Sequence, residues 1–152
     1  MNSELLEALT RMPPIENLAG AVMASVGASN AEEFTRIPVL GYHTSVGVDT
    51  ASVYIVTDRV FAMFEANAAG RSYTLTVALP RVRRIGRLED ATYTRVVIEL
   101  EADQATTVST VADSGRVDGV VIPAGYELLE TEPAGRAALR RFQAAVSMAL
   151  SL

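Results

Sequence analysis

The spacing of apolar residues changes twice along this chain, and this change limits its fold more than any other sequence feature. Apolar side chains recur at helical spacing up to about residue 30, alternate with polar ones from Thr35 to about residue 130, and return to helical spacing after Pro133. Alternation indicates half-buried strands, whereas helical spacing indicates one buried face of a helix. The chain is therefore predicted to be α+β, with consecutive antiparallel strands.

The alternation is clearest over Tyr73–Leu79, where Tyr73, Leu75, Val77 and Leu79 are separated by smaller or polar residues. Short turns containing Gly, Asn or Asp separate this segment from others of the same type. Together these segments predict a strongly bent sheet of about seven strands. The strand candidates are 37–44, 51–57, 60–64, 73–79, 81–88, 95–101, the weaker 106–112 and 117–122, and 126–130.

The last segment of the chain predicts one amphipathic helix. It begins at Pro133, since proline is favoured in the first helical turn. Leu139, Phe142, Val146 and Leu150 then recur on one side of the helix. We expect this apolar side to close one end of the bent sheet, which would otherwise leave a strand edge exposed.

Residues 1–33 are predicted to form a helical extension to a β-domain of residues 34–152. On the second predicted helix, Leu18, Val22 and Val26 form an apolar stripe that must be buried. The stripe has two interpretations. It is either part of the chain's own core or a candidate interaction helix that packs on another subunit, so that the protein is a homo-oligomer.

The composition excludes several classes of function. The chain has no Cys, which rules out disulfides and thiolate chemistry, and all 13 of its basic residues are Arg, which rules out lysine-based catalysis. No glycine-rich phosphate motif occurs, and no cofactor or metal is expected. The formal net charge of −5 opposes general binding to nucleic acid. The longest mainly apolar stretch of the chain, residues 18–28, is too short to span a membrane, so a cytoplasmic location is expected.

One dense basic cluster on a predicted strand is a candidate site for an anion or an acidic partner. Forked guanidinium groups bind phosphates and carboxylates well. The alternative is a solvated strand face, on which acidic residues of the next strand neutralise the cluster. A turn at residues 89–91 would place Arg81 near Glu99. The cluster consists of Arg81, Arg83, Arg84 and Arg87.

His43 is the only histidine and the only candidate general base of the usual kind. Ser45 and Asp49 are the residue types that a catalytic triad would need beside it. Neither lies in a recognisable nucleophile turn, so the alternative is a partly buried strand histidine. A group of acidic residues has a similar pair of interpretations, as paired carboxylates for acid–base chemistry or as a solubility feature. This group is Glu99, Glu101 and Asp103.

Two short segments resemble bacterial pleckstrin-homology-like (PH-like) proteins. Ile55–Phe61 is similar to their strand–turn–strand hairpin, and Leu79–Ile85 is similar to the entry of a later strand. With the C-terminal helix, the resemblance covers residues 34–152. It implies a bent antiparallel β-barrel of seven strands capped by one helix.

The resemblance also implies a non-catalytic domain that binds lipid headgroups, peptides or partner proteins. Members that bind headgroups carry basic residues around the first hairpin, whereas the corresponding loop here, residues 44–50, has none. We therefore expect a binding or scaffolding module that acts through protein–protein interaction, with another protein or by self-association. Binding of anions or membrane headgroups through the strand 81–87 is the alternative.

Overall fold

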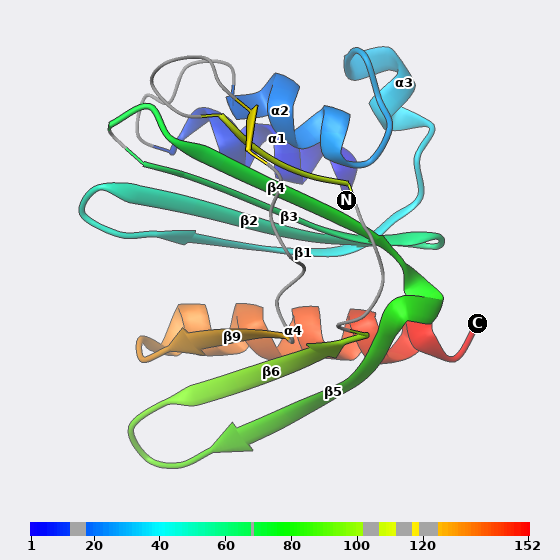
Figure 1. Ribbon diagram of the computed structural model, residues 1–152. Helices are drawn as coiled ribbons and strands as arrows, with labels where there is room; N and C mark the ends of the chain where they lie inside the picture. Colours follow the sequence, from blue (N-terminus) through cyan, green and yellow to red (C-terminus); the bar gives the residue numbers. More distant parts are fainter. Residues whose placement is uncertain (13–17, 68, 102–106, 112–116, 119–124) are drawn as a thin grey trace.

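The computed structural model describes residues 1–12, 18–67, 69–101, 107–111, 117–118 and 125–152. Its strands form two antiparallel sheets, which confirms the predicted α+β class (Figure 1). The first sheet has the strand order β1-β2-β3-β4-β7-β8, and the second has the order β5-β6-β9. Helices α1–α3 cover the outer face of the first sheet, and α4 and the second sheet lie on its other side.

The strands are β1 Val39–Val46, β2 Thr50–Thr57, β3 Val60–Asn67, β4 Ser72–Ala78, β5 Val82–Glu89, β6 Thr94–Leu100, β7 Thr107–Val111, β8 Val117–Asp118 and β9 Gly125–Glu130. The helices are α1 Asn2–Thr10, α2 Leu18–Ser25, α3 Ala31–Thr35, the 3-10 turn η1 Leu79–Arg81 and α4 Pro133–Leu150. Within the described parts of the chain, every helix falls short of the length and apolar character needed to cross a membrane.

The described strands do not close into the predicted barrel. Consecutive strands β4 and β5 belong to different sheets, because η1 separates them at Pro80. Proline has no backbone N–H to donate to a neighbouring strand, so it favours a break at this point. Helix α4 packs against β1 and β2 of the first sheet and against all three strands of the second. The helix therefore lies between the two sheets, where the strands of a closed barrel would pair with each other.

The core between the two sheets is rich in aromatic and branched side chains. The hydroxyl groups of Tyr73 on β4 and Tyr126 on β9 lie 2.9 Å apart and connect the sheets. Burial raises the pKa of Tyr54 to about 12. Burial and then the hydrogen bond with Tyr73 raise the pKa of Tyr126. The fully buried members of this core include Val56, Phe61, Leu75, Val96, Ile98, Leu139, Phe142 and Val146.

A second core lies between the first sheet and the N-terminal helices. Leu18 and Val22 are only 5% and 0% exposed there, and Val26 packs against them partly buried. The stripe proposed as an interaction helix is therefore part of the chain's own core. Residues from the sheet complete this cluster: Val39, Val53, Ile55, Phe64 and Ala66.

Two local features of the N-terminal segment did not follow from the apolar pattern of the sequence. The first helix starts at Asn2, and the Asn2 side chain donates to the carbonyl groups of Phe34 and Ile37 at 2.6 and 2.8 Å. The short helix α3 was not predicted. Asn30 caps it by accepting a hydrogen bond from the Glu33 N–H at 2.9 Å.

The turn between β2 and β3 is held by the Thr57 side chain. Its hydroxyl oxygen accepts hydrogen bonds from the backbone N–H groups of Arg59 at 3.1 Å and Val60 at 3.0 Å. Strand β2 enters this turn with almost every residue buried, since the first sheet is covered on both faces. The turn thus fixes the pairing of two strands at the centre of the protein.

Replacing Leu5 by Ala tests whether the N-terminal helices are an integral part of the fold. Leu5 is fully buried, so Leu5→Ala should lower the free energy of unfolding by about 2–5 kcal/mol. The control Leu88→Ala removes a side chain that is 55% exposed and should change the unfolding free energy by less than about 0.5 kcal/mol. Urea unfolding measures both. Equal stability of the two variants would contradict this packing.

Candidate functional site

Strand β1 is an open edge of the first sheet, since among the described residues it pairs only with β2. The Gly47 N–H donates to the Thr50 carbonyl oxygen at 2.8 Å. Because hydrogen-bonded pairs alternate along antiparallel strands, the backbone groups of Tyr42 and Thr44 point away from β2. Such outward-facing donors and acceptors can pair with an additional strand.

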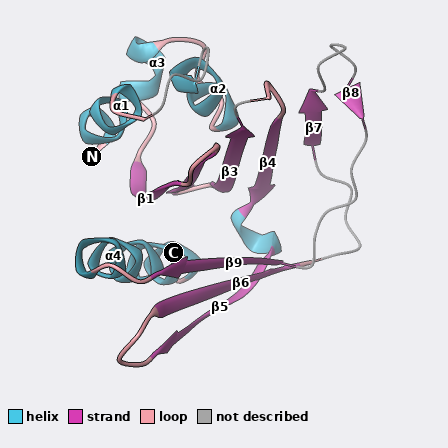
Figure 2. Cartoon of the chain, turned by 90° about the vertical axis from the view of Figure 1, so that its left-hand side faces the viewer, coloured by secondary structure: helices cyan, strands magenta, loops and turns pink. Residues whose placement is uncertain are grey.

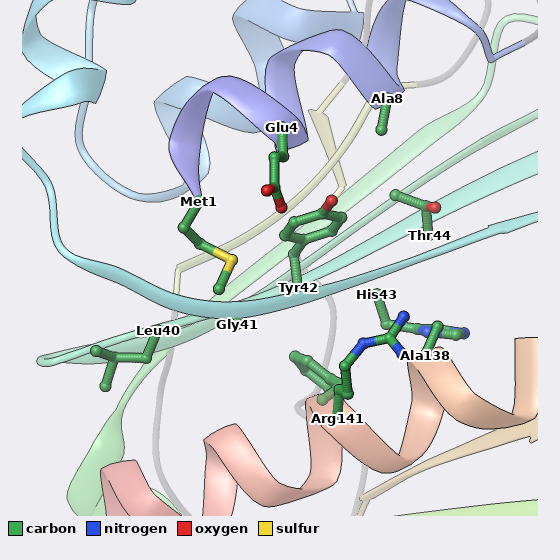
Figure 3. A pocket seen from close by; sticks show the side chains of 11 residues that line it. Met1, Glu4, Ala8, Leu40, Gly41, Tyr42, His43, Thr44, Ala138 and Arg141 are labelled. Atoms are coloured by element: carbon green, nitrogen blue, oxygen red, sulfur yellow. The ribbon is translucent and has the colours of Figure 1, made fainter.

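A cleft of about 400 Å³ runs along this edge (Figure 3). Figure 2 shows β1 at the end of the sheet, with α1 on one side of it and α4 on the other. Helix α1 contributes Glu4 and Ala8 to one wall, and α4 contributes Ala138 and Arg141 to the other. The cleft therefore has an unpaired strand edge as its floor and two helices as its walls.

Gly41 explains why α4 lies so close to β1. A Cβ atom at this position would come within 2.5 Å of the Ala145 Cβ atom, so only glycine allows the helix to approach this far. The residues that follow alternate between the two walls. Tyr42 packs on the α1 side, whereas His43 points toward α4.

The two walls of the cleft carry opposite charges. Glu4 and Arg141 are both exposed, and neither forms an ion pair with any residue that the structure describes. Both act on Tyr42 between them. Burial raises the pKa of the Tyr42 hydroxyl, the charge of Glu4 adds to this effect, and the charge of Arg141 opposes it.

His43 is 3% exposed and lines the cleft on the side of α4. Its Nε2 atom is 2.9 Å from Glu130 Oε1, and its buried Nδ1 atom has no hydrogen-bond partner among the described residues. Asp49 is exposed in the turn after β1, and no described contact joins His43 to Asp49 or Ser45. His43 thus holds β1 to the end of β9.

Glu130 sits over the first turn of α4. A side chain on Gly135 would collide with the Glu130 carboxylate, so glycine leaves the space that this carboxylate occupies. Negative charge is favourable at this end of a helix because the helix dipole is positive there. Glu130 therefore connects β1, β9 and the start of α4.

The arginine cluster lies along η1 and β5, and Arg84 and Arg87 have carboxylate partners among the described residues. Arg84 binds Glu99 on β6, and Arg87 lies 3.8 Å from Glu89. Arg83 is exposed, and the Arg81 carbonyl accepts a hydrogen bond from the Glu101 N–H at 3.0 Å. The cluster is thus partly neutralised along the strand.

The expected pairing of Arg81 with Glu99 was wrong. The turn spans Asp90 to Tyr93 rather than residues 89–91, because the Asp90 side chain accepts hydrogen bonds from the N–H groups that follow it. An irregularity between Val82 and Arg84 shifts the register further. Arg84 consequently lies opposite Glu99.

The acidic group does not converge on one described site. Glu99 forms an ion pair with Arg84, and Glu101 is exposed just after β6. Asp103 lies outside the described residues. No group of three or more potential metal ligands occurs within the described part of the chain.

Sequence reasoning missed the residues that define the cleft, namely Glu4, Tyr42 and Arg141. The one signal for an open edge was Pro38, because proline within a strand pattern is typical of edge strands. No such signal identifies the helices that wall the edge.

Comparison with known proteins gave no match to a protein family, to a curated protein or to a solved structure. The function must therefore be inferred from the chain itself.

Replacing Gly135 by Ala tests the connection between His43 and Glu130. The added methyl group should displace the Glu130 carboxylate and leave buried His43 without its partner, which lowers the unfolding free energy by about 1–3 kcal/mol. In the control Gly86→Ala the new methyl group meets nothing within 4 Å. Urea unfolding and the imidazole nitrogen NMR signals of His43 report the result. Unchanged signals in Gly135→Ala would contradict the proposed connection.

Proposed function

We propose that this chain is a cytoplasmic, non-catalytic protein-binding module that holds an extended segment of a partner protein against β1. The observation that carries this proposal is the unpaired edge of β1 at the floor of the cleft between α1 and α4. An extended segment can add to such an edge through main-chain hydrogen bonds, while the walls select its side chains.

A PH-like architecture is part of the proposal. Its support is the order of the elements: four consecutive strands in one sheet, the three strands β5, β6 and β9 in the other, and a C-terminal helix between the sheets. In this interpretation, the hairpin β7–β8 is an insertion before the last strand.

The groups in the cleft favour binding over catalysis. Its histidine, His43, is deeply buried and already contacts Glu130. A general base must reach a proton of the substrate, and a buried, paired imidazole is poorly placed to do so. The charged groups Glu4 and Arg141 lie on opposite walls, which suits recognition of a ligand between them.

Anion binding along the Arg81–Arg87 strand has weaker support. Arg84 and Arg87 each have a carboxylate nearby, which reduces the positive potential that a phosphate group would meet. The net charge of −5 adds a general repulsion of anionic surfaces. The β1 cleft offers main-chain groups as well as charges, and it is the better candidate.

Panning a displayed library of short random peptides on the purified protein tests this function. Enriched peptides should slow amide hydrogen exchange at Tyr42 and Thr44, whose backbone groups face the cleft. The variant Ala138→Trp fills the cleft from the α4 wall and should weaken binding by about tenfold or more.

The matched control is Ala144→Trp, which places the same side chain on an exposed position of α4 that does not line the cleft. It should bind peptides like the wild type. The proposal fails if no peptide is enriched, or if Ala138→Trp and Ala144→Trp bind equally well.

A further inference from the structure

We infer that the segment held along β1 carries a basic and an acidic residue at adjacent positions, the basic one facing Glu4 and the acidic one facing Arg141. This inference rests on the proposed function and specifies the chemistry of the partner segment. It follows from the two faces of β1, from two charges in the cleft that have no ion-pair partner among the described residues, and from the symmetry of strand pairing.

The faces of an added strand are set by β1. Directly opposed residues on neighbouring strands share a face of the sheet, and successive residues alternate between faces. A residue opposite Tyr42 would therefore point toward α1, and its neighbour opposite His43 would point toward α4 (Figure 3). Two adjacent side chains of the bound segment thus meet different walls.

Each wall offers one unpaired charge to these side chains. Glu4 stands on the α1 wall and Arg141 on the α4 wall. Neither belongs to an ion pair within the described part of the chain, although Glu7, on the same helix as Glu4, pairs with Arg11 at 2.5 Å. A Lys or Arg on one face of the segment and an Asp or Glu on the other would complement both.

The same charges disfavour a second copy of this chain as the occupant. Antiparallel pairing of two β1 edges about a twofold axis keeps the faces of the two sheets aligned. It would bring α1 toward α1 and α4 toward α4, and when the axis lies at Tyr42 and His43, in the middle of the cleft, Glu4 approaches Glu4 and Arg141 approaches Arg141. Like charges across an interface oppose association. The occupant is therefore a segment of a different protein.

Two synthetic peptides of identical composition test the charge pattern. Both combine one Lys and one Glu with flanking Val and Thr. In the first peptide Lys and Glu are adjacent, so they face opposite walls. In the second they are separated by one Thr, so they face the same wall. The first should bind about five- to tenfold more tightly, since each matched ion pair contributes a few-fold at a partly exposed site.

Reversing the charge of one wall should change the preference. In Glu4→Arg both walls are positive. A peptide with two adjacent Glu residues should therefore bind this variant more tightly than the peptide with adjacent Lys and Glu. The control Glu32→Arg makes the same change in net charge on α3, away from the cleft, and should keep the original preference. The double variant Glu4→Arg/Arg141→Glu should again prefer adjacent Lys and Glu, after a shift of one residue.

The outcomes separate this inference from the proposed function. Equal binding of both peptides, blocked by Ala138→Trp, would overturn the charge pattern and leave the binding function intact. Enriched library peptides that Ala138→Trp fails to block would overturn the proposed function itself. A dimer in light scattering that Glu4→Gln strengthens would overturn the assignment to a different protein.

Discussion

The close packing of α4 against β1 at Gly41 is the contact on which the rest of the structure depends. It places one helix against strands of both sheets, and so it completes the core around Phe142 and Val146. It also fixes the α4 wall of the cleft. Because α1 covers the other face of the same strand, β1 is enclosed on both sides, while its outer edge pairs with no strand in the described part of the chain.

Much of the secondary structure could be predicted, because alternation and helical spacing are local properties of the sequence. The segments containing β2, β4 and α4 follow directly from them. Helix α3 was not predicted because a helix this short shows no apolar periodicity. Asn30 and Glu33 nevertheless form a recognisable capping pair. The barrel did not close because α4 separates the sheets, and local patterns contain no information about such long-range packing.

The candidate site was harder to predict from the sequence than the secondary structure. Its walls come from the two ends of the chain, and the partner of His43 lies 87 residues away at Glu130. Asp49 was the nearer carboxylate in sequence, yet the turn after β1 leaves it exposed. The arginine cluster was conspicuous because its members are close in sequence, whereas Glu4 and Arg141 are brought together only by folding.

The coverage of the first sheet on both faces has a consequence for how the chain finds its correct strand alignment. A sheet with one wet face resists slippage, since a shift by one residue would expose its apolar side chains. Along β2, where Val53, Tyr54, Ile55 and Val56 are all buried, this protection is largely lost. The Thr57 turn must supply it instead, through its two backbone hydrogen bonds. The Thr57 hydroxyl thus favours one alignment of the β2–β3 hairpin over its slipped alternatives.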